Sequence, residues 1–347
     1  MAYLREGRKI LKLSELGEFA LIDRIAKGIK VQESRVKVGI GDDAAVIKTS
    51  KSALTVLTSD TLIQGIHFDF KYYTFFELGW KALAVNISDV IAMGAKATEA
   101  LITLGLPKDI RVEAVDELYT GIKRLAGRYR ISIVGGDMVS SPKEVVISIT
   151  LVGEVKKKNL LLRRGAKVGD SILVTGDLGT SCLGLHVLKK KGRAKSKKLK
   201  YAINKHLLPE PRVSEANVIA ASGLATSMID ISDGLTMSLS EIGKLSKIGS
   251  LIWIDALPIK KRVRDAAKKL GKSALDFALY GGEDYELLVT CKKGDALRLA
   301  SLVEKKTGTP LTIIGEIVSK KKGIKLITRK GKLVPVKARG YEHFRSR

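Results

Sequence analysis

Five short islands of aspartate contain the residues in this chain best suited to chemistry. They read GIGDDAA (39–45), TSDT (58–61), NISD (86–89), VGGD (134–137) and IDISDG (229–234). A carboxylate next to glycine or a small hydroxyl residue fits a strand end or turn that a hard cation can approach. Mg²⁺ prefers oxygen ligands and recruits one or two carboxylates together with substrate phosphates. The islands therefore predict one multi-metal phosphate site, lined by Asp42, Asp43, Asp60, Asp89, Asp137, Asp230 and Asp233.

Each aspartate taken alone has a simpler explanation, which is that it caps a turn or a helix. That explanation is the better one for any single island. The recurrence of five islands, each at the end of an apolar run, favours the shared site instead.

The composition is that of a folded chain large enough for two domains. It has 347 residues, of which 45% are hydrophobic and 28% charged, which is typical of globular proteins. No apolar run reaches membrane-spanning length, and the first residues show no signal-peptide core. Cys182 and Cys291 lie in apolar surroundings without metal-ligand spacing. We therefore expect buried thiols and a cytoplasmic protein without a membrane partner.

The formal net charge of +26 is the one unusual feature of the composition. Lysine and arginine cluster at 189–200, 260–269 and 319–332. Such patches can neutralise nucleic-acid phosphates, but these segments lack the interleaved aromatic residues that stack on bases. A solvated basic surface is the favoured interpretation, with no specific nucleic-acid partner. A basic nucleic-acid-binding protein remains the alternative from a different functional class.

Strands and helices alternate along the chain, and the pattern predicts an α+β fold with two related domains. Strands are expected at 36–40, 53–60, 97–106, 131–136 and 143–155, and helices at 76–95 and about 111–128. The pattern restarts after a charged connector near residue 156, with a strand at 171–177 and helices at 179–190, 213–222 and 235–246. The predicted domains are thus 1–155 and 156–347, the second an α/β sandwich-like domain.

The common nucleotide-binding motifs do not fit. GKS occurs at 271–273, but Ala266 stands where a phosphate-binding loop needs its first glycine. GIGDDA matches a dinucleotide fingerprint formally, yet two carboxylates in the turn would repel a pyrophosphate unless a cation intervenes. The protein-kinase motifs are also missing. Phosphate binding through a metal ion is therefore predicted.

The ordered motifs GIGDDAA, TSDT, GIHF, KALAVNISDVIAMGA, GGD, LRRGAKVGD, IDISDGL, GGEDYEL and RGYEHF resemble those of the thiamine-monophosphate kinase family. This family belongs to the superfamily of aminoimidazole ribonucleotide synthetase and selenophosphate synthetase. The resemblance runs from about residue 18 to about 344, and its strength lies in the order of the motifs. It implies an ATP-dependent transfer of a phosphoryl group to thiamine monophosphate, giving thiamine diphosphate without a phosphoenzyme.

The resemblance also implies a role for individual residues. Metal-binding positions match Asp42, Asp43, Thr58, Ser59, Asp60, Asp89, Asp137 and Asp230, with Asp233 at a further Mg²⁺ site. ATP contacts match Tyr129, Gly136, Asp137, Arg163 and Ser232, although the adjacent Arg164 leaves the choice of arginine open. Contacts to thiamine monophosphate match His67, Glu283 and Tyr341.

The family resemblance further implies a homodimer, in which the N-terminal sheets form a joint barrel. No residue is expected to act as a general base, because the acceptor is already an ionised phosphate and the reaction needs positioning and charge neutralisation. An aminoimidazole ribonucleotide synthetase-like enzyme is the alternative within the superfamily. Residues 1–30 contain no cysteine and the chain ends HFRSR, which argues against the selenophosphate synthetase and hydrogenase-maturation members. The segments 1–14 and 189–200 have no predicted role.

Overall fold

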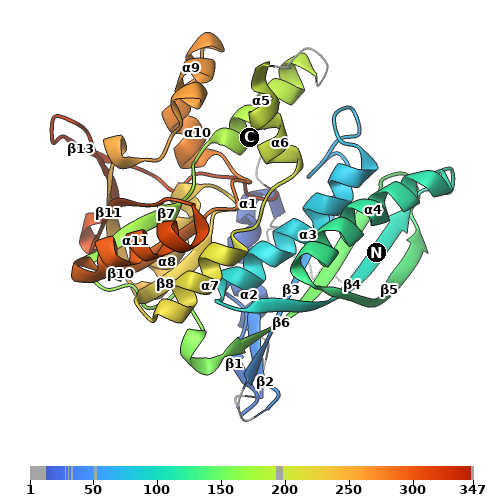
Figure 1. The fold of residues 1–347 in the computed structure, drawn as a ribbon, viewed down its shortest axis with the longest axis horizontal. Helices are drawn as coiled ribbons and strands as arrows, with labels where there is room; N and C mark the ends of the chain where they lie inside the picture. The colour runs from blue at the N-terminus through green and yellow to red at the C-terminus, as the bar shows by residue number, and fades with distance from the viewer. Residues whose placement is uncertain are drawn as a thin grey trace, which may run out of the picture.

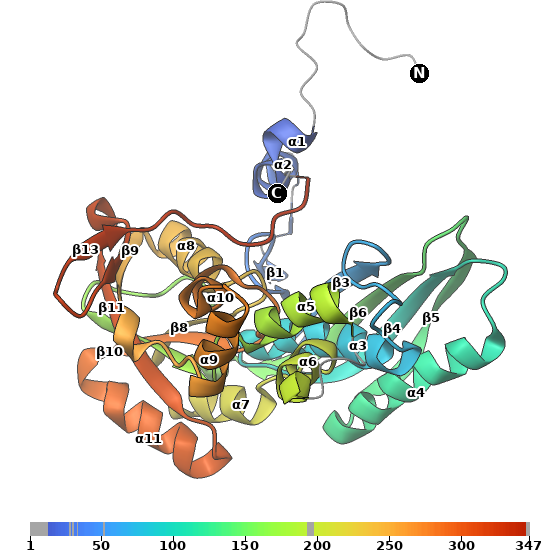
Figure 2. The same ribbon diagram turned by 90° about the horizontal axis from the view of Figure 1, so that it is seen from above.

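A computed structural model describes residues 13–27, 29, 31–32, 34–50, 53–192 and 198–344. Within these residues the strands form two sheets, which lie in different halves of the chain (Figures 1 and 2). The segments without a predicted role, 1–14 and 189–200, lie outside the described residues at 1–12 and 193–197. The N-terminal helices α1 (Leu13–Leu16) and α2 (Glu18–Ala26) lie beside the C-terminal tail (Figure 2).

The first sheet has the strand order β1-β2-β3-β6-β4-β5. Its strands are antiparallel except for the parallel pair β4–β5. Along β3, β4 and β6 buried apolar residues alternate with more exposed residues, so that one face carries the core and the other stays open. The strands are β1 (Val36–Val38), β2 (Ala45–Lys48), β3 (Ala53–Ile63), β4 (Lys96–Leu106), β5 (Ser132–Ser140) and β6 (Val146–Lys156).

Helix α3 (Phe75–Ala92) is the central element of the molecule. It packs on β3 and β6, runs beside α4 (Val112–Tyr129) and also contacts β8, α6 and α7 of the second half. Its start is fixed by a capping box, in which Thr74 and Glu77 satisfy each other's backbone N–H groups. A side chain at Gly121 would place its Cβ 2.0 Å from the Phe76 carbonyl oxygen, so glycine permits the close approach of α4. Because α3 is covered on all sides, its polar residues lie inside the protein.

The second sheet has the order β13-β12-β9-β11-β7-β10-β8, with one parallel pair, β12–β9. Strand β7, between β11 and β10, is buried along its whole length, and β10, between β7 and β8, is buried except at Lys292. The strands are β7 (Asp170–Thr175), β8 (Ala225–Asp230), β9 (Ile248–Trp253), β10 (Leu287–Lys292), β11 (Leu311–Ser319), β12 (Ile324–Ile327) and β13 (Leu333–Pro335).

The helices of the second half surround this sheet, with α8 packed on β8 and β9, and α11 packed on β11 and α7 (Figure 1). Their bounds are α5 (Thr180–Lys191), α6 (Lys200–Leu207), α7 (Val213–Ser222), α8 (Leu235–Ser246), α9 (Lys261–Lys269), α10 (Ala274–Tyr280) and α11 (Ala296–Thr307). The helices predicted at 213–222 and 235–246 are thus confirmed as α7 and α8. No helix in the described part of the chain is both long and apolar enough to span a membrane.

Candidate active site

Three of the predicted aspartates meet where the two halves of the chain touch. Asp43 precedes β2, Asp89 lies in the last turn of α3, and Asp230 ends β8. Each offers a carboxylate oxygen, and these oxygens lie within 4.8 Å of one another. Asp43 and Asp230 are buried, and Asp89 is partly buried. Residues that are far apart in the sequence therefore form one carboxylate cluster.

Hydroxyl and amide side chains hold the carboxylates in place. The Thr58 hydroxyl donates to Asp89 Oδ2 over 2.8 Å, and the Ser88 hydroxyl donates to Asp230 Oδ2 over 2.6 Å. Asn86 Oδ1 accepts a hydrogen bond from the backbone N–H of Asp60 over 3.1 Å. Helix α3 thus contributes one ligand candidate and two residues that fix the surrounding backbone and side chains.

Arg163 is the cation of the cluster. Its Nη2 lies 2.6 Å and its Nε 3.0 Å from Asp43 Oδ1. The neighbouring Asp42 accepts hydrogen bonds from the backbone N–H groups of Asp43 and Arg163. Arg164 is exposed. Of the two adjacent arginines, Arg163 is the one that reaches the aspartates.

The carboxylate cluster carries more negative charge than the protein compensates. Burial, followed by repulsion from Asp60, Asp230 and Asp43, raises the pKa of Asp89 well above its ordinary value. Burial and then the Asp43 charge raise the pKa of Asp230 to about 8 and that of Asp42 to about 6. Asp43 Oδ2 is buried without a hydrogen-bond partner among the described residues. This donor set fits a divalent cation, which would supply the missing positive charge.

Asp233 lies one loop beyond Asp230, and its backbone carbonyl accepts a 3.4 Å hydrogen bond from the Tyr341 N–H. Burial, then the charges of Glu18 and Asp60, raise the pKa of Asp233 to about 7. Ser232, predicted to contact the nucleotide, is its neighbour, and the Ser232 carbonyl accepts from the Glu283 N–H over 2.5 Å. The segment 230–233 therefore joins the metal candidates to the predicted acceptor residue.

Ser59 and Asp137 do not join this cluster within the chain. The register pairs Asp60 with Ile149, Ile149 with Ile102, and Ile102 with Gly136, so that three strand spacings, roughly 14 Å, separate Asp60 from β5. Strand alternation turns Ser59 and Asp137 to the open face of the sheet, and both are exposed. Ser59 Oγ lies 3.2 Å from Thr150 Oγ1, and Asp137 accepts from the Met138 N–H over 2.9 Å.

The remaining predicted nucleotide residues are spread over the first domain. At Gly136 an added Cβ would lie 1.8 Å from the Ile102 carbonyl oxygen, so the close approach of β4 and β5 requires glycine there. Tyr129 ends α4, half-buried, and its ring lies 5.5 Å from the Arg128 guanidinium carbon. Burial raises the pKa of Tyr129. Neither residue touches the carboxylate cluster in this structure.

Two of the predicted acceptor residues lie together. The His67 ring centroid is 6.5 Å from that of Tyr341, and His343 lies between them, with its Nε2 3.3 Å from His67 Nε2. His67 Nδ1 accepts the Ile63 N–H over 3.0 Å, which fixes the ring. Burial, then the nearby His343 and Lys81, lower the pKa of His67 to about 4. The ring is therefore neutral near pH 7.

Glu283, the third acceptor residue, is held by groups that were not predicted. Its Oε1 lies 2.5 Å from Lys81 Nζ, and its Oε2 lies 3.0 Å from His206 Nδ1. Although burial opposes ionisation, Lys81 and His206 hold the pKa of Glu283 below its ordinary value. The sequence signal for Lys81 was a lone charge inside the apolar run WKALAV, whereas the lone His206 gave none.

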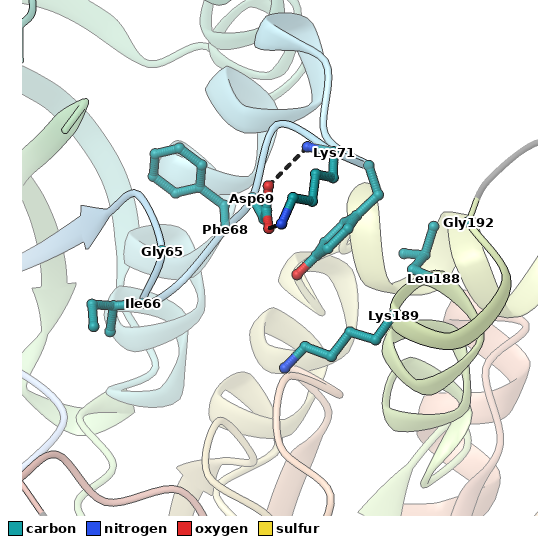
Figure 3. A pocket seen from close by; sticks show the side chains of 9 residues that line it. Gly65, Ile66, Phe68, Asp69, Lys71, Leu188, Lys189 and Gly192 are labelled. Atoms are coloured by element: carbon teal, nitrogen blue, oxygen red, sulfur yellow. Dashed lines mark hydrogen bonds and ion pairs between the residues drawn. The ribbon is translucent and has the colours of Figure 1, made fainter. Parts of the chain in front are cut away.

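A cavity of about 520 Å³ is lined by Ile66 and Phe68, the chain neighbours of His67, although none of the three acceptor residues lines it (Figure 3). One wall is the loop after β3, which includes Gly65, Phe68 and Asp69, and the other is the end of α5 at Leu188 and Lys189. In Figure 3 the Lys189 side chain extends across the opening toward the loop, where Lys71 pairs with Asp69. Both halves of the chain thus form this cavity.

Comparison with protein families explains the two-part architecture. The family described as "AIR synthase related protein, N-terminal domain" matches residues 41–155, and its C-terminal counterpart matches residues 167–327. The fold and the carboxylate cluster therefore define a two-domain protein of the AIR synthase related class. The predicted α+β fold with two domains of this superfamily is confirmed. A chain of a structure described as the HypE-HypF complex, 18% identical with a TM-score of 0.73 over 92% of this chain and 99% of its own, shares the fold alone.

Relatives within this class are more specific. The thiamine-monophosphate kinase of Buchnera aphidicola (subspecies Schizaphis graminum) is 39% identical over 95% of this chain and 99% of its own length. That of Bacillus subtilis is 33% identical over 95% and 100%. A structure described as AaThiL complexed with AMPPCP and TMP is 34% identical, with a TM-score of 0.83 over 96% of this chain and 99% of that one. The chain belongs to the thiamine-monophosphate kinase family, as its ordered motifs predicted.

Proposed function

We propose that this chain transfers the γ-phosphoryl group of ATP to thiamine monophosphate, with Mg²⁺ held by the aspartate cluster. The observation that carries the proposal is the gathering of Asp43, Asp89 and Asp230 within 4.8 Å on elements of both domains. Relatives named thiamine-monophosphate kinase support the acceptor, and the related complex with AMPPCP, an analogue of ATP, supports the nucleotide. The products are thiamine diphosphate and ADP.

Mg²⁺ would be held by Asp43, Asp89 and Asp230, with Asp42, Thr58 and Asp60 beside them and Asp233 at a further position. Bound there, it would neutralise the charge of two phosphorylated reactants that repel each other. The orphaned Asp43 Oδ2 and the raised carboxyl pKa values support this assignment. Ser59 and Asp137 remain predicted ligands, and from their positions they would reach a metal site only through a second copy of the chain.

The protein's own residues contribute positioning rather than covalent chemistry. Arg163 holds the Asp43 carboxylate by two N–H groups, and Thr58 and Ser88 orient Asp89 and Asp230. Arg163 and Ser232 are proposed to meet the nucleotide, together with Tyr129 and Gly136. The acceptor phosphate is already ionised near pH 7, so direct in-line transfer needs no general base.

The acceptor's rings are proposed to bind among His67, Glu283 and Tyr341. The thiazolium ring is a cation, which a carboxylate and an aromatic face suit physically. The neighbouring cavity of about 520 Å³ is within the range of small-molecule sites. The acceptor phosphate would then point toward the aspartate cluster.

A homodimer built on the open face of the first sheet is the proposed assembly. On that face, Leu101 of β4 and Val139 of β5 are exposed apolar residues. Exposed apolar residues on an open sheet face are typical of an interface. Pairing of two such sheets into a barrel would cover them, and Ser59 and Asp137, which face the same side, could then join a site through the second copy.

Three further assignments stay predictions. The domain boundary at about residue 155 falls at the end of β6, the last strand of the first sheet. The free, buried thiol of Cys291 supports the predicted cytoplasmic location. A nucleic-acid-binding role would account for the net charge of +26 but leaves the buried aspartate cluster unexplained.

The test is turnover with ATP, thiamine monophosphate and Mg²⁺, followed by thiamine diphosphate formation. We expect EDTA to abolish product, and Asp43→Asn and Asp89→Asn to lower the rate by about 100-fold or more, because phosphate charge is left uncompensated. The matched control is Asp265→Asn, an exposed carboxylate paired with Lys261. Full activity in EDTA, or wild-type rates in both cluster variants, would refute the metal scheme.

A further inference from the structure

Lys81 is an unusual residue in the middle of α3. Its side chain has 0% exposure, although burying an ammonium group is unfavourable unless the charge is compensated. Three oxygen atoms surround its Nζ: Glu283 Oε1 at 2.5 Å, Tyr73 Oη at 3.0 Å and the His67 carbonyl at 3.5 Å. Two of these three residues belong to the proposed acceptor site. The buried charge is therefore connected with acceptor binding rather than with the helix alone.

His206, on α6 of the second domain, holds the other side of Glu283. Its Nδ1 lies 3.0 Å from Glu283 Oε2, and its Nε2 is buried without a partner among the described residues. A protonated Nε2 would leave a donor unsatisfied, so the neutral ring with hydrogen on Nδ1 fits best. Burial lowers the pKa of His206, which agrees with that form. His206 Nδ1–H thus donates to the Glu283 carboxylate at 3.0 Å, and the Ser181 hydroxyl is its second neighbour at 3.2 Å.

The backbone of Glu283 is also held in one conformation. Its φ angle is 66°, in the left-handed region that residues other than glycine seldom adopt. Its N–H donates to the Ser232 carbonyl over 2.5 Å, next to Asp233. Backbone strain of this kind persists only when its surroundings impose it, and it concentrates at functional sites. Glu283 is therefore held at three points: its backbone N–H bonds to Ser232, and its carboxylate contacts Lys81 and His206.

A second buried glutamate provides the comparison within the same chain. Glu286 pairs with Lys205 at 2.5 Å and Arg212 at 2.6 Å, and its side chain has 0% exposure. The Glu283 side chain keeps 26% exposure. Glu286 thus faces protein on all sides, as expected for a structural network, whereas Glu283 keeps one side open to a ligand.

We propose that Lys81 and His206 are positioning residues that hold the Glu283 carboxylate ionised and oriented toward the ring portion of the acceptor. The inference rests on the proposed function and deepens it. A carboxylate with two donors already engaged can still accept an N–H group or face a cationic ring. The arrangement selects an acceptor with a cationic or N–H-bearing heterocycle and disfavours an acidic or purely hydroxylated one.

The first experiment compares Lys81→Met with Lys205→Met in the full-length protein. Both variants remove a lysine that lies 2.5 Å from a glutamate, but only Lys81 serves Glu283. We expect Lys81→Met to raise the KM for thiamine monophosphate by about 10-fold or more, the effect of one lost charged contact. The KM for ATP should stay within about twofold. Lys205→Met should leave the ratio of the two KM values unchanged.

A double-mutant cycle distinguishes action through Glu283 from a general effect on the fold. In the Glu283→Gln background, Lys81→Met should add less than about twofold to the acceptor KM. Additive losses, or equal losses for ATP and acceptor, would overturn the inference. If Lys81→Met does not fold, the same cycle is run with His206→Leu, and His206→Gln, which keeps a donor, should restore the acceptor KM.

Different experimental results would refute the role of Lys81 and His206 and the proposed function. If the wild type turns over thiamine monophosphate and neither Lys81→Met nor His206→Leu changes its KM, the inference alone is wrong. If the wild type shows no turnover, calorimetric titration of wild type and Lys81→Met with thiamine monophosphate decides. Weaker binding by the variant supports the inference, and equal binding or none refutes it.

Discussion

Replacing Asp230 by asparagine should stabilise the metal-free protein while it abolishes activity. Asp230 is 2% exposed at the end of β8, and among the described residues only the Ser88 hydroxyl donates to its Oδ2. Burial and the Asp43 charge raise its pKa from 3.8 to about 8. Asparagine keeps an oxygen that can accept from Ser88, carries no charge and has nearly the same volume. Buried carboxylates that repel one another lower the stability of the protein when no cation is bound between them.

The magnitude follows from the linkage between pKa and folding. The folded-state pKa of Asp230 lies above its unfolded value. Asp230 therefore does not reduce the free energy of unfolding below about pH 4, and it reduces this free energy increasingly as the pH rises toward 8. At pH 7 about three pH units separate the solution from the unfolded pKa, each worth about 1.4 kcal/mol. The upper limit of the stabilisation is therefore about 4 kcal/mol, and relaxation within the cluster should reduce it toward about 2 kcal/mol.

The assay is urea denaturation of wild type and Asp230→Asn in EDTA, at pH 7 and again at pH 5. The variant should be more stable at pH 7, and the difference in the free energy of unfolding should shrink at pH 5. Saturating Mg²⁺ should stabilise the wild type, by about 3 kcal/mol at 100 times its Kd, and the variant less. Asp177→Asn is the matched control, because this buried carboxylate pairs with Lys260 at 2.5 Å and its loss should destabilise the protein.

The result that would refute this reasoning is a destabilised Asp230→Asn protein in EDTA at pH 7. Asp230 would then act as a structural hydrogen-bond acceptor, like Asp177, and the raised pKa would have no thermodynamic consequence. An Mg²⁺-induced stabilisation of the same size in both proteins would remove Asp230 from the metal ligands.

Two other predictions concern the acceptor and the assembly. Glu283→Gln and Tyr341→Ala should weaken the binding of thiamine monophosphate while ATP affinity stays nearly intact, as measured by calorimetry; equal losses for both ligands, or none, would place these residues outside the acceptor site. Light scattering should give the wild type the mass of a dimer and Leu101→Asp that of a monomer, since a charge on the open sheet face disrupts its burial. Val112→Asp, on the exposed side of α4, is the control, and a dimeric Leu101→Asp would contradict the proposed interface.

Local patterns were sufficient for many elements of the fold. The helix predicted at 76–95 is α3 (Phe75–Ala92), and the one at 235–246 is α8 (Leu235–Ser246). These segments carry apolar residues at helical spacing and end at clear capping or glycine signals. The strands β11 and β12 and the helix α11 were not predicted, although Ala296, Leu299 and Val303 of α11 are buried at helical spacing.

Site residues were predictable from the sequence only where a single short motif indicates their chemistry. The aspartates of the islands stand beside glycine or hydroxyl residues, and three of them do meet. Lys81, His206 and His343 were missed because their significance depends on partners far away, such as Glu283, which is 202 positions from Lys81. Residue spacing cannot reveal a contact between domains. The family motifs, in turn, could not separate Ser59 and Asp137 from the cluster, since strand alternation decides which face each occupies.

Helix α3 carries Lys81 near its middle and Asp89 in its last turn. With a rise of 1.5 Å per residue, their backbones are about 12 Å apart along one rigid axis. In the proposed scheme, the helix therefore sets the distance between ring recognition near Lys81 and phosphoryl transfer near Asp89. An acceptor whose linker is one or two methylene groups longer or shorter than that of thiamine monophosphate would satisfy one end and miss the other. Selectivity for length is then a property of one buried helix, independent of the contacts at either end.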